Sequence, residues 1–115
     1  MMYTWDRIVA ETKNAGGRIY SLPHGNYENK TFLLKSVRLE DLGGKGFFTL
    51  RECEELDLDE DYYVIKRLMR AYQNGANIPP VILDSNYDVI DGSHRLGAMF
   101  ELGTTFFGAY VMRGE

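Results

Sequence analysis

The residues of this chain best suited to chemistry lie together at Asp91-Gly92-Ser93-His94-Arg95. They follow an apolar run and precede a segment with helical periodicity, so we expect them where a strand meets the start of a helix. Such a start carries amide groups without intrahelical partners and a partial positive charge, which together favour phosphate or another anion. The junction, as we call residues 91–95, is therefore a candidate anion site.

Each side chain of the junction has a role in such a site. Gly92 permits a close approach of the backbone to a ligand, or a backbone angle closed to other residues. Ser93 can cap the helix or hydrogen-bond to phosphate, while His94 and Arg95 add donors, and Arg suits paired contacts with phosphate oxygens. Asp91 would repel a bare anion, so we interpret it as a Mg²⁺ ligand, a base, or a partner that orients His94 or Arg95.

A purely structural interpretation uses the same residues. In it, Ser93 caps the helix, Asp91 and Gly92 form a turn, and His94 and Arg95 face solvent. Cations at a helix N-terminus oppose its dipole by about 0.3–1 kcal/mol, and a bound anion would remove that conflict. We therefore favour a functional site, with Asp91 and His94 as catalytic candidates and Gly92, Ser93, His94 and Arg95 as phosphate-binding candidates.

The elements around the junction mix helices and strands. Apolar periodicity predicts helices over residues 4–15, 59–74 and 93–102, and strands over residues 31–39, 78–83, 87–90 and 106–111. A brief strand is expected at residues 18–20, a loop with His24 at 22–29 and a turn at 43–46. The expected caps are Thr4 for the first helix and Asp57 or Asp59 for the second, and the expected stops are Gly16-Gly17, Asn74-Gly75 and Gly103.

Composition narrows the function classes. The chain has 115 residues, of which 44% are hydrophobic, enough for one domain with a core, and its net charge of −4 gives no general attraction to nucleic acid or anionic lipid. Cys53 is the single cysteine, which excludes an intrachain disulfide and fits a reducing cytosol.

No signal peptide and no long apolar run is evident, so we expect a cytoplasmic protein without a membrane span. The acidic residues between 52 and 61 are explained by a helix start, although they could hold Mg²⁺ if they face the junction.

Residues 78–111 carry a family resemblance. They contain Ile78-Pro79-Pro80-Val81-Ile82-Leu83, then Tyr87-Asp88-Val89-Ile90-Asp91-Gly92-Ser93-His94-Arg95-Leu96-Gly97-Ala98, then Leu102-Gly103 before the last expected strand. This pattern resembles the ParB/sulfiredoxin superfamily, and with the preceding strand and helix the resemblance covers about two thirds of the chain. It implies an α+β fold with a mixed sheet flanked by helices. We expect a single domain over residues 1–115, with its core at 31–115 and an N-terminal extension with an extra helix at 1–30.

The resemblance also implies a ligand. Members bind nucleotide phosphates at the corresponding turn, and include nucleotide-hydrolysing partition proteins, sulfiredoxins, free-serine kinases and nucleases. For this chain it implies ATP or another nucleotide, with Mg²⁺, at Gly92, Ser93, His94 and Arg95. Sulfiredoxins carry a reactive cysteine where this chain has Ser93, whose hydroxyl cannot supply thiolate chemistry. Partition proteins typically have Gly-Glu-Arg-Arg at this turn, so the motif is nearest to that of the free-serine kinases.

Three functions stay open. The favoured one is nucleotide hydrolysis or phosphoryl transfer, in which Asp91 and His94 assist catalysis. The second is a non-catalytic protein-interaction or inhibitor module that uses the N-terminal helix or Tyr62, Tyr63 and Tyr72. The third is a nuclease or nucleic-acid-binding protein with a basic stripe of Lys66, Arg67, Arg70 and Arg95.

Overall fold

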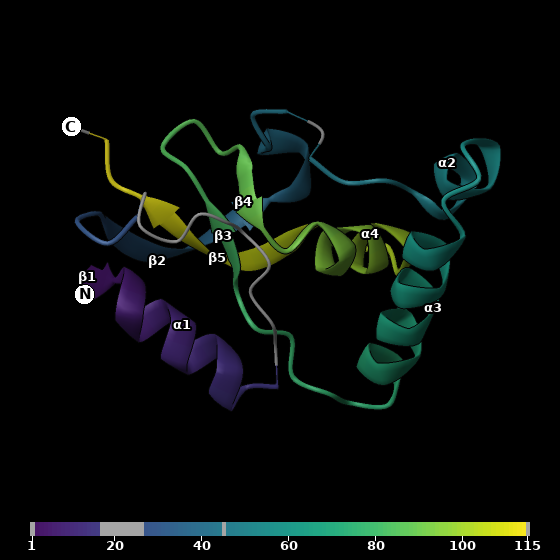
Figure 1. Cartoon of the computed structure of the whole chain (residues 1–115), viewed down its shortest axis with the longest axis horizontal. Coiled ribbons are helices and arrows are strands. Elements are labelled where there is room, and N and C mark those ends of the chain that lie inside the picture. Colours follow the sequence, from purple (N-terminus) through teal and green to yellow (C-terminus); the bar gives the residue numbers. More distant parts are fainter. Residues whose placement is uncertain (1, 17–26, 45, 115) are drawn as a thin grey trace.

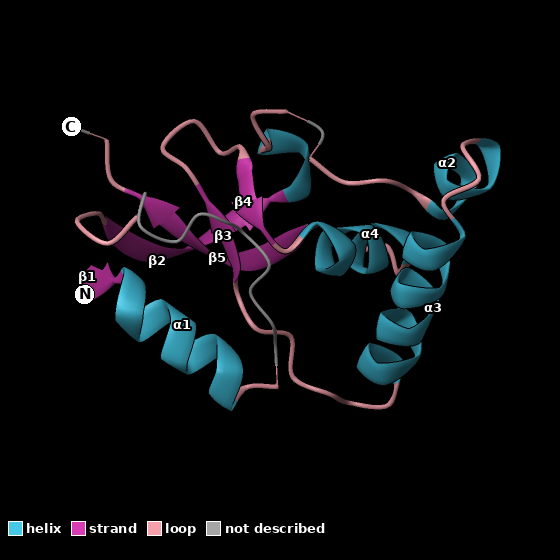
Figure 2. Cartoon of the chain, viewed as in Figure 1, coloured by secondary structure: helices cyan, strands magenta, loops and turns pink. Residues whose placement is uncertain are grey.

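Five strands form one mixed sheet in the order β1-β2-β5-β3-β4 (Figure 2). They are β1 (Met2–Thr4), β2 (Thr31–Arg38), β3 (Val81–Leu83), β4 (Val89–Asp91) and β5 (Phe106–Met112). β5 pairs antiparallel with β2 and parallel with β3, which confirms the predicted mixed sheet. This computed structural model describes residues 2–16, 27–44 and 46–114, so the strand expected at 18–20, and His24 with most of its loop, lie outside the described residues.

The sheet lies between two helices, and two more helices pack beyond one of them. α1 (Trp5–Asn14) covers one face of the sheet, and α4 (Ser93–Glu101) covers the other (Figure 1). α2 (Leu50–Glu55) and α3 (Asp59–Gln73) lie on the side of α4 that faces away from the sheet. The expected α+β fold with an extra N-terminal helix is therefore confirmed.

β3 shows why the apolar run at residues 81–83 is uninterrupted. Alternate side chains of a strand point to opposite faces of its sheet. Val81 and Leu83 pack with Leu96 of α4, whereas Ile82 packs with Trp5 of α1. All three β3 side chains are fully buried, because a helix covers each face. A strand buried on both faces is expected to be apolar throughout.

A third apolar cluster joins α2, α3 and α4. Its buried members are Cys53, Ile65 and Ala98, one from each helix. Gly97 allows the helices to approach closely, since a Cβ there would lie 2.9 Å from the carbonyl oxygen of Phe48 and 3.0 Å from Cδ1 of Ile65. α4 is therefore buried on the side of the sheet and on the side of α3.

The predicted helix limits are partly confirmed. Thr4 caps α1, because its side chain accepts a hydrogen bond from the Arg7 amide at 3.3 Å. Gly75 and Gly103 follow the ends of α3 and α4 with φ of 89° and 77°. The prediction that Asp57 or Asp59 caps α3 is wrong. Leu58 is the N-cap and no side chain caps the helix, because the chain turns sharply from α2 through Asp57, which has φ of 55°.

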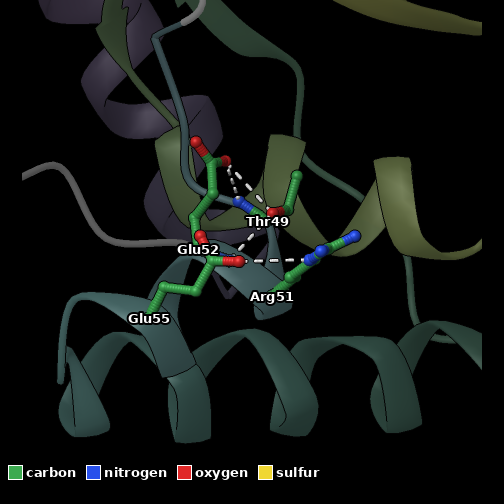
Figure 3. Close-up of polar contacts among 4 residues, drawn as sticks. All are labelled: Thr49, Arg51, Glu52 and Glu55. Carbon is green, nitrogen blue, oxygen red and sulfur yellow. Dashed lines mark hydrogen bonds and ion pairs between the residues drawn. The ribbon is translucent and has the colours of Figure 1, made fainter.

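Three elements of the described residues were not predicted: β1, α2 and a short 3-10 helix at Leu39–Asp41. β1 is three residues long and pairs with the start of β2. α2 has six residues, too few for a visible helical period, but it begins with a capping box (Figure 3). Glu52 accepts a hydrogen bond from the Thr49 amide at 3.0 Å, and the Thr49 hydroxyl accepts one from the Glu52 amide at 3.1 Å. These reciprocal bonds stabilise a helix start that packing alone would define poorly. None of the described helices is both long and apolar enough for a membrane span.

Candidate functional site

The junction lies at the end of β4, where the sequence predicts it. Gly92 is the N-cap of α4 and has φ of 113°. A Cβ at this position would lie 2.6 Å from Cγ1 of Val81, which leaves no space for a side chain. Gly92 is therefore required by the backbone angle and by the packing of β3 against the turn.

Asp91 and Arg95 form a buried ion pair. Nη2 of Arg95 donates to Oδ2 of Asp91 at 3.1 Å, and Nη1 donates to the carbonyl oxygens of Pro79 and Pro80, each at 3.0 Å. The two side chains are 8% and 6% exposed. Burial lowers the pKa of Arg95, and the charge of Asp91 acts in the opposite direction. Of the roles considered for Asp91, the geometry matches a partner that orients Arg95, while Arg95 as a phosphate ligand stays a prediction.

His94 has a different acidic partner, which the sequence did not identify. Its Nε2 lies 2.6 Å from Oδ1 of Asp61, in the first turn of α3. Both side chains are about one-third exposed, at 34% and 37%. Asp61 belongs to the acidic segment that was explained by a helix start. No spacing rule links positions 33 apart, so the pairing arises from the packing of α3 on α4.

Ser93 does not cap α4, contrary to the structural interpretation. It is the first residue of the helix, and within the described residues no side chain caps this helix. Leu96 is the first to donate within the helix, from its amide to the Gly92 carbonyl at 2.9 Å. The amides of the preceding turn are therefore available to water or a ligand.

A cavity of about 870 Å³ opens beside the junction. All five predicted site residues line it, together with Glu60 and Arg67 of α3. A volume of this size is within the usual range for small-molecule sites. Arg67 was predicted as part of a basic stripe with Lys66, Arg70 and Arg95. Arg95 is buried, whereas the other three are exposed on α3, so the four do not form one surface stripe.

A smaller cavity of about 370 Å³ adjoins the same residues. Ser93 and His94 line both cavities, and Asp61 lines the smaller one. In the described part of the chain, no three His, Cys, Asp or Glu side chains gather where they could hold a metal ion. The expected Mg²⁺ therefore has no protein-built site of that kind among these residues.

Comparison with known proteins identifies the fold. No family model and no curated protein matches the sequence. Two solved structures are similar, one described as the C2221 form of a Pnob8-like ParB-N domain and the other as a pNOB8-like ParB N-domain. The first has a TM-score of 0.52 and 20% identity over 76% of this chain, and the second a TM-score of 0.51 and 22% identity over 76%. This chain has a ParB-like fold.

The similarity concerns part of each matched protein. The chain spans 32% and 30% of the two ParB N-domain structures, about a third of their length. At this level of sequence identity the comparison establishes the ParB-like fold alone. The chemistry of the junction therefore has to be argued from its own residues.

Proposed function

We propose that the protein binds a nucleotide, with the phosphates at the start of α4. The observation that carries this proposal is the cavity of about 870 Å³ whose wall includes the uncapped start of a nine-residue helix. Amide groups and the helix dipole attract anions at such a point. Ser93 adds a hydroxyl donor, and Arg67 adds a positive charge from the α3 wall.

The buried pair below the helix start has a positioning role in this proposal. Arg95 links α4 to the residues before β3 by donating hydrogen bonds to the carbonyl oxygens of Pro79 and Pro80. Asp91 neutralises the charge of Arg95. Gly92 supplies the turn. We therefore assign phosphate contacts to Ser93, the first-turn amides and Arg67, and we assign Asp91 and Arg95 to holding these groups in place.

His94 is the candidate base for hydrolysis or phosphoryl transfer. When its Nε2–H donates to Asp61, its Nδ1 is left with the lone pair that can accept a proton. Mg²⁺ would accompany the nucleotide, because it commonly binds phosphate oxygens and one or two carboxylates, and Glu60 is a carboxylate of the cavity wall. The metal would supply charge neutralisation at the phosphates.

Calorimetric titration tests the proposal. ATP, CTP, GTP and UTP are titrated separately, each with Mg²⁺, into the wild type, Ser93→Ala and Arg67→Gln. We expect at least one nucleotide to bind, and each variant to bind about tenfold more weakly, the change expected for one charge-assisted contact. Arg70→Gln is the matched control, because Arg70 is exposed on the same helix and does not line the cavity. No binding by the wild type, or equal affinities for all variants, would contradict the proposal.

A protein-interaction function is the second candidate. It is favoured by the exposure of large apolar side chains, at 69% for Tyr63, 58% for Phe106 and 45% for Phe100. A stoichiometric protein complex captured from the native host, together with no nucleotide binding, would select this function over the first.

A further inference from the structure

A further cavity lies at the opposite end of α4 from the junction. It has a volume of about 950 Å³, and its walls come from the end of β2, the short 3-10 helix with the loop after it, the end of α4 and the start of β5. None of the five junction residues lines it. α4 has nine residues, so its two ends lie about 13 Å apart at about 1.5 Å per residue. This cavity is therefore a separate site, and its chemistry does not depend on the proposed function.

Three phenylalanine rings give this cavity an aromatic wall. Phe47 and Phe100 pack together, with their ring centroids 5.7 Å apart and their planes at 48°. Phe106 is 58% exposed and Phe100 is 45% exposed, and all three rings line the cavity. The face of an aromatic ring is negative, and it attracts a cation that lies within about 6 Å of the ring centre. The wall can therefore bind an organic cation as well as a neutral apolar group.

The charged side chains at the rim favour a cation over an anion. Arg38 is the one cation among the described lining residues, and two carboxylates bind it. Its Nη1 lies 2.9 Å from Oε1 of Glu40, and its Nε donates to Oδ2 of Asp41 at 3.1 Å. The group has one positive and two negative charges, so it is negative overall. Glu40 is 70% exposed, which leaves its carboxylate within reach of a ligand.

The end of α4 adds to this negative potential. The C-terminus of a helix carries a partial negative charge, which favours cations near the last turn. Phe100 belongs to that turn, and Gly103 and Thr104, which follow the helix, also line the cavity. The helix therefore presents its positive end to the larger cavity and its negative end to this one. A positive ligand is favoured here for the same physical reason that phosphate is favoured at the junction.

The remaining walls define the polarity of the ligand. Leu39 and Leu42 add apolar surface beside the rings, so the ligand should be apolar as well as positive. A quaternary nitrogen suits such walls, because it has no N–H groups whose hydrogen bonds to water would be lost on burial. We propose that this cavity binds a free quaternary ammonium compound, with its alkylated nitrogen against the rings of Phe100 and Phe106 and its charge near Glu40.

Three probes that share one aromatic ring test the preference for positive charge. Benzyltrimethylammonium, benzyl alcohol and benzoate are titrated separately into the full chain and followed by amide chemical shifts. We expect benzyltrimethylammonium to bind about tenfold more tightly than the neutral alcohol, with benzoate weakest. The shifted amides should include those of Phe100 and Phe106. Equal affinities, or a preference for benzoate, would overturn the inference.

Variants of Phe106 test the location of the cation. Phe106→Leu keeps an apolar side chain without the ring, and Phe106→Trp supplies the aromatic side chain that attracts cations most strongly. The affinity for benzyltrimethylammonium should fall about fivefold in Phe106→Leu and be retained in Phe106→Trp. Phe48→Leu is the matched control, because Phe48 is 45% exposed and lies outside this cavity. Equal affinities of Phe106→Leu and Phe48→Leu for this probe would overturn the inference.

A charge variant tests the contribution of the rim. Glu40→Gln removes the negative charge but keeps an oxygen that can accept from Arg38. The preference for benzyltrimethylammonium over benzyl alcohol should fall about threefold in Glu40→Gln. It should be unchanged in Glu54→Gln, which alters an exposed carboxylate of α2 outside this cavity. An identical preference in both variants would show that the carboxylate of Glu40 does not select the ligand and would contradict the proposed pose.

Discussion

Nε2 of His94 lies 2.6 Å from Oδ1 of Asp61, so a hydrogen bond joins the first turn of α4 to the first turn of α3. The two residues come from helices that the sequence predicts separately. Their contact gives His94 a defined orientation and aims its other ring nitrogen away from Asp61. This bond is the structural basis for treating His94 as a base with one preferred tautomer.

Removal of Asp61 should change the tautomer of His94. In the neutral form of His94, the wild type should carry the ring proton on Nε2, where Asp61 accepts it. Asp61→Ala should give a mixture of the two tautomers, measured by long-range ¹H–¹⁵N correlation of the ring nitrogens. The chain has two histidines, so His24→Gln assigns the signals. Unchanged ¹⁵N shifts of His94 in Asp61→Ala would show that the contact does not select the tautomer.

Gly92→Ala should destabilise the chain more than Gly103→Ala. Both glycines have positive φ, of 113° and 77°, and a side chain there costs about 1–2 kcal/mol. At Gly92 the new Cβ also meets Val81 at 2.6 Å, whereas at Gly103 it meets nothing within 4 Å. The clash should add about 1–3 kcal/mol to the loss of unfolding free energy, measured by urea titration. Equal losses of unfolding free energy at the two sites would mean that β3 shifts to accommodate the added methyl group.

The buried ion pair of Asp91 and Arg95 should contribute more to the free energy of unfolding than an exposed ion pair does. Arg95→Met leaves the Asp91 carboxylate buried without its guanidinium partner and should lower the unfolding free energy by about 3–5 kcal/mol. Arg51→Met removes an exposed pair with Glu55, at 88% and 60% exposure, and should cost less than about 1 kcal/mol. Denaturant unfolding of both variants measures the difference. A small loss for Arg95→Met would indicate that water replaces the guanidinium.

Cys53 should make the chain less stable in alkali. Burial raises the pKa of its thiol in the folded state, so the folded chain holds this proton more tightly than the unfolded chain. The resulting stabilisation is complete below about pH 8.5, the ordinary pKa of a thiol, and is lost as the pH rises through the folded-state pKa. Urea midpoints between about pH 7 and pH 10 should therefore fall more steeply in the wild type than in Cys53→Ala. Parallel slopes in the two proteins would contradict this effect of burial.

The strength of local patterns decided how much of the fold could be predicted. Apolar periodicity is clear in the segments that form α3 and α4, so both helices, and the junction that precedes α4, were placed correctly. β1 was missed because it runs directly into α1 with no turn residue between them, and α2 was missed because six residues are too few to show a helical period. The capping box of Thr49 and Glu52 was a local signal that could have revealed α2.

The sequence identified the residues of the junction but not most of the contacts that their side chains make. The sequence placed Asp91, His94 and Arg95 together and offered Asp91 as a partner for either neighbour. Asp91 ends β4 and Arg95 lies in the first turn of α4, so the turn at Gly92 brings the two side chains together. The partnership of His94 with Asp61 depends on how two helices pack, as do the positions of Glu60 and Arg67 on the cavity wall. No local rule contains that information.

The position of α4 has a consequence for the whole molecule. One wall of the larger cavity is formed by the junction, at the end of β4. Another wall is formed by α3, which packs on α4. The sheet and the helices beyond α4 are stabilised by different clusters of buried apolar residues. A ligand that contacts both walls would link these two parts of the chain. We expect occupancy of this cavity to increase the cooperativity of unfolding, so that the sheet and the helices beyond α4 melt in one transition.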